Sequence, residues 1–283
     1  MMAKASPRRG TDGGKKSFAF VASLEKGISV LRAFAGVDGP MRLIDIVAAT
    51  NLERSAAQRL VYTLEEMGLL IQDRRTKLYA LSPRVLEFCF AYLRNDRLAS
   101  AALPYLLEAN KACEEAVTLV EPYDTEVYYV TRVPSRRAVA MDVVPGTWFP
   151  AWCIAAGRAI LAFLPEGQAR DIVERSKLAR YTTNTLTGKA QIMDALKKAR
   201  QDGYAVSKEE YGYGDISIAA PVFDAADNVI AAVSISGPTD RWTLAQATRD
   251  LAPLAKAAAA RISESLRGVS TLAQPGRFIP PRR

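Results

Sequence analysis

The sequence contains no histidine among its 283 residues. Without imidazole the chain cannot form Ser–His or Cys–His nucleophiles, and it lacks the side chain on which most zinc sites depend. Its three cysteines, Cys89, Cys113 and Cys153, are widely spaced and form no CxxC pair. This spacing predicts reduced thiols in the protein core and a reducing compartment. We therefore expect no catalytic residues, no metal and no cofactor.

Long apolar segments are also missing, since no run approaches the roughly 18–20 residues that span a bilayer. The basic stretch MMAKASPRRGTDGGKKS is not followed by the apolar segment of a signal peptide. We expect disordered tails at residues 1–20 and 268–283, no membrane association and a cytoplasmic location. With 49% hydrophobic residues, the chain is long enough to form two cores.

The net charge of +8 is unevenly distributed along the chain. Residues 1–97 hold 16 Lys and Arg against 10 Asp and Glu, whereas residues 98–283 hold 22 against 20. The positive excess therefore lies in the N-terminal third, which favours a nucleic-acid partner for that part of the chain.

The stretch LIDIVAATNLERSAAQRLVYTLEEMGLLIQD, residues 43–73, has the pattern of two short helices around a tight turn. Asn51 stands at the turn, and asparagine tolerates the left-handed backbone that such a turn needs. The apolar residues at helical spacing are Leu43, Ile46 and Val47, then Ala57, Leu60, Leu64 and Met67. This pattern predicts a helix-turn-helix, a shape that fits the major groove of double-stranded DNA.

The outer face of the second predicted helix is polar. Arginine can bridge guanine edges, glutamine can pair with adenine, and hydroxyls can donate to backbone oxygens. The candidate DNA-contacting residues of this face are Arg54, Ser55, Gln58, Arg59 and Tyr62. The alternative is an ordinary solvated face on a small helical domain.

The residues after this helix predict a β-hairpin, because two apolar runs, LLI and LYAL, flank the polar segment QDRRTK. Directly after a recognition helix, such a hairpin is the wing of a winged helix-turn-helix. Arg74, Arg75 and Lys77 at its tip would face phosphates or the minor groove. A preceding helix is expected over residues 23–34, with Ser23 as N-cap and with Leu24, Ile28 and Leu31 buried.

We divide the rest of the chain into a linker helix, residues 83–97, and a second domain, residues 98–267. The linker helix opens at Pro83 and is too apolar for an exposed rod, which favours packing against a second subunit. The second domain alternates helical segments with adjacent strand pairs. This order predicts an antiparallel sheet with flanking helices, and hence an α+β fold rather than a doubly wound parallel sheet.

Four segments of the chain resemble the IclR-type bacterial transcriptional regulators. They are SLEKGISVLRAF, NLERSAAQRLVYTLEEMGLL, RVPSRRAVAMDVVPGTWFPAWCIAAGRAILAFL and GYAVSKEEYGYGDISIAAPVFDAADNVIAAVSISGP, and the resemblance covers about residues 21–265. It implies a winged helix-turn-helix, a linker helix and a GAF-like effector domain, assembled as a dimer or a dimer of dimers on a palindromic operator. The third segment is most similar to regulators of aromatic-acid catabolism, such as those for protocatechuate or 4-hydroxybenzoate.

The resemblance also implies an effector cavity between the sheet and the helix that begins near residue 155. The positions that match its lining are Ala138, Met141, Ala155, Ala156, Ser207, Asp215, Ser217, Ser234 and Ser236, and we add Trp152 as an aromatic wall. Some relatives carry an acidic residue in place of Ser207 and a cysteine in place of Ser217, so a different ligand is expected here. The predicted effector is a small, aromatic carboxylic acid.

A second class of function remains open, namely an enzyme or a small-molecule sensor whose N-terminal domain makes only protein contacts. The adjacent Glu209 and Glu210 are its candidate carboxylate pair. Neighbouring residues of a strand point to opposite faces, which argues against joint catalysis by these two groups.

Overall fold

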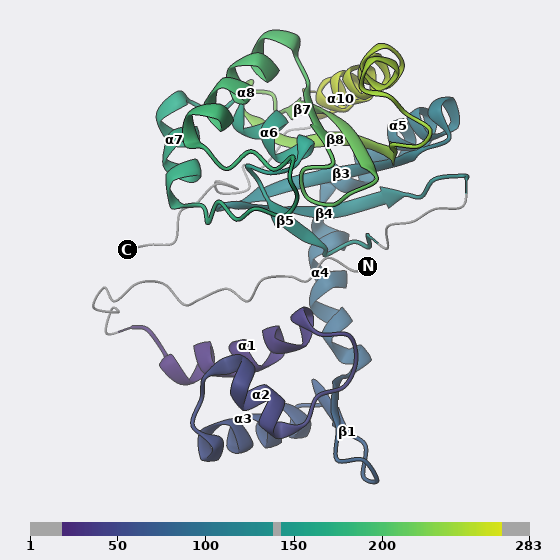
Figure 1. Ribbon diagram of the computed structural model, residues 1–283. Helices are drawn as coiled ribbons and strands as arrows, with labels where there is room; N and C mark the ends of the chain where they lie inside the picture. The colour runs from purple at the N-terminus through teal and green to yellow at the C-terminus, as the bar shows by residue number, and fades with distance from the viewer. Residues whose placement is uncertain (1–18, 138–142, 268–283) are drawn as a thin grey trace. The chain divides into compact units, whose positions relative to one another are not determined.

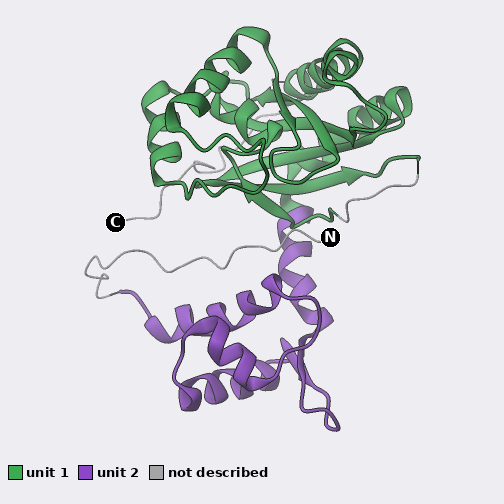
Figure 2. Ribbon diagram, viewed as in Figure 1, with its two compact units in different colours: residues 1, 95–282 green, residues 2–94, 283 purple. Residues whose placement is uncertain are grey.

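The computed structural model describes residues 19–137 and 143–267, so the predicted tails fall almost wholly outside it, as do Ala138 and Met141. The chain forms two compact units, and the boundary between them in the sequence falls between Arg94 and Asn95 (Figure 2). Among the described residues, no helix is both long enough and apolar enough to cross a membrane.

The N-terminal unit packs three helices and a small hairpin around one core (Figure 1). Its elements are α1 (Ala22–Ala33), a 3-10 turn (Phe34–Gly36), α2 (Leu43–Thr50), α3 (Arg54–Glu66), β1 (Leu70–Gln72) and β2 (Tyr79–Leu81). Val30, Ile46 and Val61 are at most 1% exposed and lie at the centre of this core. Helices α1, α2 and α3 contact one another pairwise, so α3 is held in place by the other two helices.

Some details of the predicted helices are wrong. The N-cap of α1 is Val21 rather than Ser23, and its side chain makes no capping hydrogen bond. Leu24 and Ile28 of α1 are 65% and 40% exposed, and Met67 after α3 is 53% exposed. Each lies on a helix face that the described residues leave exposed, so helical spacing predicted burial for side chains that do not contact the core.

The chain leaves the N-terminal unit through a 3-10 turn (Pro83–Val85) and helix α4 (Leu86–Asn95), and helix α5 (Arg97–Cys113) follows as part of the C-terminal unit. The hydroxyl of Ser82 caps the turn by accepting from the Arg84 amide at 3.1 Å. Asp96 separates α4 from α5, and its carboxylate accepts from the amides of Leu98 and Ala99. No residue of α4 is buried, in contrast to seven in α5.

The C-terminal unit is built on a six-stranded antiparallel sheet with the strand order β5-β4-β3-β8-β7-β6. The strands are β3 (Ala116–Tyr123), β4 (Glu126–Val133), β5 (Trp148–Pro150), β6 (Ala205–Lys208), β7 (Asp215–Phe223) and β8 (Val229–Pro238). The predicted α+β fold with an antiparallel sheet is confirmed, although the short strands β5 and β6 were not predicted.

Helices cover both faces of this sheet (Figure 1). The outer face packs against α5 and α10 (Ala252–Arg267), which follows α9 (Leu244–Gln246) and a π-helical turn (Ala247–Leu251). The inner face, defined here as the opposite one, packs against α6 (Ala155–Leu161), α7 (Glu166–Arg175) and α8 (Lys189–Asp202). All three cysteines are free, but Cys89 is exposed rather than in the core as predicted.

Candidate functional site: a DNA-binding face and an effector-binding face

The turn between α2 and α3 has the geometry that Asn51 predicts. Its φ and ψ are 55° and 32°, in the left-handed region, and its amide donates to the Val47 carbonyl at 2.9 Å. This bond ends α2, so α3 begins three residues later at Arg54 and crosses it. The two helices and their turn form the expected helix-turn-helix.

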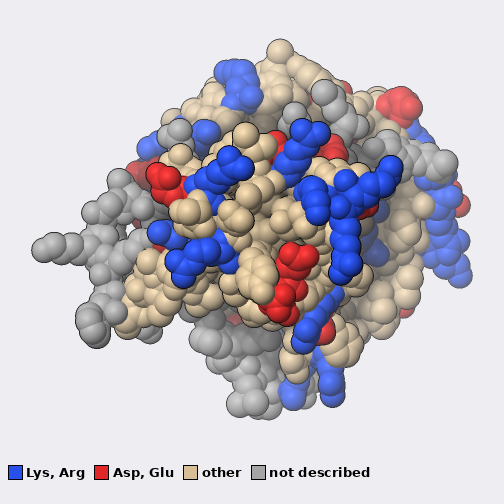
Figure 3. Space-filling view, turned by 90° about the horizontal axis from the view of Figure 1, so that it is seen from below, with Lys and Arg blue, Asp and Glu red and all other residues tan. Residues whose placement is uncertain are grey.

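Helix α3 separates its buried and exposed residues cleanly. Ala57, Val61 and Leu64 face the core and are 0%, 1% and 7% exposed. The five candidate DNA-contacting side chains of this helix are all exposed, and they are Arg54, Ser55, Gln58, Arg59 and Tyr62. Lysine and arginine side chains outnumber acidic ones on the face of the molecule that Figure 3 shows. The sequence pattern therefore places a polar face where a recognition helix needs one.

The hairpin after α3 is short and regular. Leu70 pairs with Leu81 and Gln72 with Tyr79, and Met41 adds an isolated bridge to Tyr79. The Asp73 carboxylate accepts from the Arg75 and Thr76 amides at 2.8 Å each, and these hydrogen bonds lower the pKa of Asp73. This local bond network orders the tip without using a basic side chain.

The three basic side chains of the hairpin tip are Arg74, Arg75 and Lys77, and all of them are exposed. Lys77 adopts a φ of 60°, a left-handed conformation that closes the turn. The tip thus presents positive charge at the end of a two-stranded hairpin, as a DNA-binding wing does.

The sheet register brings the candidate effector-binding serines together on its inner face. Ser217 lies between Ser207 on β6 and Ser236 on β8, and Ser234 pairs with Ala219 and Thr118 in the next row. The residues that alternate with them, such as Ile216, Ile218 and Ile235, are 0% exposed in the outer-face core. Strand alternation therefore aims these four hydroxyls toward α6.

Asp215 also belongs to the inner face, because it precedes Ser217 by two positions on β7. It lies near enough to Tyr129 of β4 to contribute to raising the pKa of that phenol, which burial raises most. Arg132, also on β4, acts on Tyr129 in the opposite direction. Burial raises the pKa of Asp215 from 3.8 to about 7. The inner face thus carries an acid, a phenol and a guanidinium in addition to its serines.

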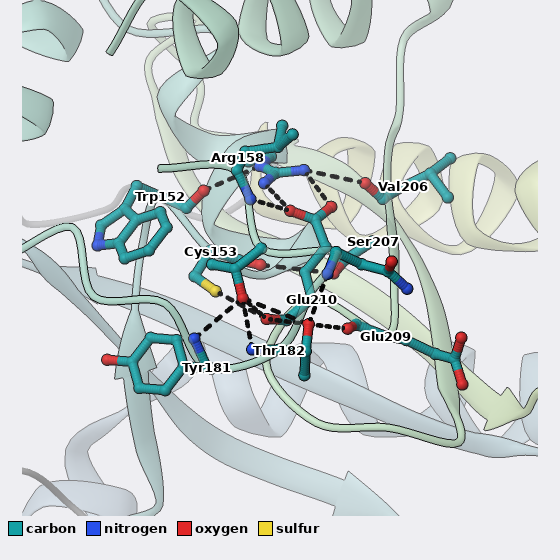
Figure 4. Close-up of polar contacts among 12 residues, drawn as sticks. Trp152, Cys153, Arg158, Tyr181, Thr182, Val206, Ser207, Glu209 and Glu210 are labelled. Carbon is teal, nitrogen blue, oxygen red and sulfur yellow. Dashed lines mark hydrogen bonds and ion pairs between the residues drawn. The ribbon is translucent and has the colours of Figure 1, made fainter. Parts of the chain in front are cut away.

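The segment that opposes these strands is tightly packed. Trp152, Ala155 and Ala156 are at most 1% exposed, and α6 begins at Ala155 as the sequence predicts. The Ser207 hydroxyl donates to the Cys153 carbonyl at 3.4 Å, which links this segment to β6 (Figure 4). A ligand held between α6 and the serines would therefore be almost entirely enclosed, as is usual for small-molecule sites.

A buried ion pair, which the sequence analysis missed, holds this segment in place. The Arg158 guanidinium binds both carboxylate oxygens of Glu210, with a distance of 2.7 Å from Nη1 to Oε1, and its Nε donates to the Trp152 carbonyl at 2.9 Å (Figure 4). The side chains of the pair are 3% and 9% exposed. The Thr185 hydroxyl donates to the Glu210 carbonyl at 2.6 Å. The sequence analysis noted only the Gly-Arg of AAGRA, and this motif does not predict that Arg158 binds a carboxylate 52 residues away.

The reason given against a Glu209–Glu210 catalytic pair was wrong, since neither residue lies in a strand. Strand β6 ends at Lys208, and Glu209 has a φ of 54°. The Glu209 carboxylate accepts from the Gly214 amide at 2.9 Å, whereas Glu210 is neutralised by Arg158. The two carboxylates therefore have separate structural roles. Among the described residues, no three His, Cys, Asp or Glu side chains gather as metal ligands.

Aromatic rings continue from this segment along the inner face. Trp152 stacks on Tyr181 with ring centroids 6.2 Å apart, and Tyr181 lies 4.5 Å from Tyr211. Tyr211 meets Phe149 edge to face at 4.8 Å, and Phe149 meets Tyr129 at 5.2 Å. Trp152 is therefore the buried end of an aromatic row that reaches Tyr129, and the serines and Asp215 supply the polar groups of the same face.

Asp215→Asn is expected to raise the free energy of unfolding at about pH 8 and to leave it nearly unchanged at about pH 4. Between the ordinary pKa of 3.8 and the folded-state value of about 7, the native protein keeps a proton that the unfolded chain has lost. Stability therefore falls as pH rises through this window, and asparagine removes the fall. One pKa unit corresponds to about 1.4 kcal/mol, and partial solvent access reduces the gain to about 2 kcal/mol. Denaturant titrations at both pH values measure the effect, and identical pH profiles for the two proteins would contradict it.

The fold and the polar face of α3 define a DNA-binding transcriptional regulator with a separate C-terminal domain. A model of the IclR helix-turn-helix domain matches residues 23–74, and one of the bacterial transcriptional regulator IclR C-terminal domain matches residues 90–264. The chain belongs to the IclR family, as its sequence motifs predict. This family consists of transcriptional regulators, so the enzyme alternative is wrong.

Individual relatives match over nearly the whole chain. The Pca regulon regulatory protein of Pseudomonas putida is 30% identical over 88% of this chain and 85% of its own length. A crystal structure of a transcriptional regulator from Rhodococcus sp. RHA1 has 32% identity and a TM-score of 0.75, covering 89% of this chain and 100% of that one. An IclR homologue from Microbacterium hydrocarbonoxydans, solved with 4-hydroxybenzoate, shares the fold at 23% identity and a TM-score of 0.72, covering 87% and 100%.

Proposed function

We propose that the protein regulates a catabolic operon in response to a small aromatic carboxylic acid. In this proposal residues 21–82 bind a palindromic operator, residues 83–97 connect the domains, and residues 98–267 bind the effector and a second subunit. A regulator that acts on the chromosome of a bacterium works in the cytoplasm. The observation that carries the proposal is the exposed polar face of α3 in a chain whose second domain presents a separate polar, aromatic-lined face.

Two relatives support the effector class. One is named for the Pca regulon, and another was crystallised with 4-hydroxybenzoate. The inner face of the sheet offers suitable chemistry, because aromatic rings supply apolar walls and serine hydroxyls supply a few polar anchors. A gel-shift titration of operator DNA with a panel of aromatic and aliphatic acids tests the proposal. An effector should change operator affinity by a coupling of about 1–3 kcal/mol, and a panel without any effect would refute the effector class.

Arg59→Ala is expected to weaken operator binding by about 1–3 kcal/mol if this side chain reads a base, with relaxed preference at one position of the site. Lys77→Ala should instead weaken binding to all duplexes similarly and should flatten the salt dependence, because a phosphate contact carries no sequence information. Lys197→Ala, which removes an exposed charge from α8, is the matched control. Fluorescence anisotropy at several salt concentrations measures both effects. Full operator affinity in both DNA-face variants would rule out this face.

We propose that the protein is a homo-oligomer, at least a dimer, and that α4 contributes to the interface. Leu86, Phe88 and Phe90 of this helix are 61%, 65% and 63% exposed, which is unusual for three large apolar side chains in one ten-residue helix. A two-fold dimer would also match a palindromic operator. Light scattering should give a dimer or tetramer at micromolar concentration, and Phe88→Asp should shift the mass toward the monomer. A wild-type monomer with full operator affinity would contradict the proposal.

A further inference from the structure

Asp215 is the one acidic residue in the set that we assigned to the effector-binding face. It opens β7, where its carbonyl accepts from the Glu209 amide at 2.8 Å and its Cα partner across the strand pair is Pro238. Ile216 follows it on the outer face at 0% exposure, so the pleat of the strand turns the Asp215 side chain to the inner face with Ser217. This position is fixed by a regular strand and not by a loose loop.

The carboxylate of Asp215 differs in its partners from those of Glu115 and Glu210 in the same domain. Glu115 is bound by Arg241 at 2.7 and 2.9 Å and by the Trp242 indole at 2.8 Å, and Glu210 is bound by Arg158. No side chain in residues 19–137 or 143–267 forms a hydrogen bond or an ion pair with the Asp215 carboxylate, although the residue is partly buried. A carboxylate in such a place is destabilising unless a donor satisfies it.

The groups around Asp215 decide what kind of donor fits. The phenol of Tyr129 and the hydroxyl of Ser217 share its face of the sheet, and neither brings a positive charge. The guanidinium of Arg132 on β4 lies on the same face and acts on Tyr129, but the pKa of Asp215 is raised by burial without an opposing effect of Arg132. An ionised carboxylate is an acceptor only, so it favours a hydroxyl or amino group on a ligand. It also repels a second carboxylate, so an acid ligand must keep its own charged end away from Asp215.

We propose that Asp215 selects effectors that carry a hydroxyl or amino donor on the ring, at the end opposite their carboxylate. This inference rests on the proposed effector class and names the chemistry within it. The donor of the ligand occupies the acceptor that residues 19–137 and 143–267 leave without a hydrogen bond. An acid without a ring donor would bury the Asp215 carboxylate without a hydrogen bond. The cost of that unpaired group lowers the affinity for such an acid, and sites of this kind discriminate most strongly between ligands with and without the donor.

Calorimetric titration of the full-length protein at about pH 8, where Asp215 is largely ionised, tests this inference. The ligands with a ring donor are 4-hydroxybenzoate and 4-aminobenzoate, and those without one are benzoate and 4-methoxybenzoate. The wild-type protein should bind the donor ligands at least about tenfold more tightly. Asp215→Leu should abolish that preference, Asp215→Asn should reduce it, and the exposed control Asp194→Asn should retain it.

The outcomes separate the two levels of the proposal. Equal affinity of wild-type protein for 4-hydroxybenzoate and 4-methoxybenzoate would overturn the role of Asp215 while leaving the aromatic-acid effector class intact. A donor preference that survives in both Asp215 variants would overturn it as well. Failure of all four acids to bind the wild-type protein would overturn the effector class and this inference together.

Discussion

Glu210→Gln should lower the free energy of unfolding by about 3–5 kcal/mol, because it leaves the Arg158 guanidinium charged and buried without its counter-ion. The pair is enclosed, with side chains 3% and 9% exposed, and the contact is bidentate. Arg158 also donates to the Trp152 carbonyl, so the variant disturbs the entire segment from Trp152 to the start of α6. Arg158→Met should be destabilising to a similar extent, since it leaves the Glu210 carboxylate buried.

A double-mutant cycle distinguishes the value of the pair from the penalty of breaking it. Arg158→Met combined with Glu210→Met should recover much of the loss, because apolar side chains of similar volume often replace a buried ion pair without net destabilisation. Glu166→Gln is the control, since its partner Arg170 lies on the surface and such pairs contribute about 0–1 kcal/mol. Chemical denaturation measures the wild type, Arg158→Met, Glu210→Met and the double variant, and also the single variants Glu210→Gln and Glu166→Gln. A loss below about 1 kcal/mol for Glu210→Gln would show that water reaches the pair.

Gly157→Ala should destabilise the protein by about 3 kcal/mol or more, or prevent folding, although alanine is the better helix former. A Cβ at this position would overlap the carbonyl oxygen of Ala151 and would lie within 2.5 Å of its Cα. Both are backbone atoms of the packed segment before α6, so no side-chain rotation can relieve the clash. The close approach of this segment to α6 therefore requires glycine at position 157.

Gly167→Ala provides the matched control in helix α7. No atom lies within 4 Å of a Cβ at this position, so the variant should be as stable as the wild type or more stable by up to about 1 kcal/mol. Thermal unfolding followed by circular dichroism compares the two variants. If Gly157→Ala unfolds at the same temperature as Gly167→Ala, the segment before α6 is not held against the helix as described.

The local features of the N-terminal unit could be predicted from the sequence because the signals are local. Asn51 marked the turn, and helical spacing placed Ala57 and Leu64 in the core. The same spacing wrongly buried Leu24 and Met67, because a periodic pattern shows which residues share a face but not whether this chain covers that face.

The sequence predicted the α+β class of the C-terminal unit, but it did not predict the short strands, the strand register or the long-range ion pair. Strands β5 and β6 have three and four residues, too few to show an alternation. The Arg158–Glu210 pair joins residues far apart in the sequence, and no local pattern around either residue predicts its partner. Alternation alone put Ser234 and Ser236 on one face, but only the register showed that Ser217 and Ser207 lie in line with Ser236.

The alternation of β7 and β8 has a consequence for how such a regulator can change its ligand. The isoleucines of these strands pack against α5 and α10, whereas the serines face the opposite side and are small enough to be exchanged without creating a large void. The isoleucines of these strands therefore stabilise the fold, whereas the serines of the same strands are available to contact a ligand. A lineage, or a laboratory building biosensors, could vary the inner-face residues over many chemistries while the outer face keeps the sheet folded.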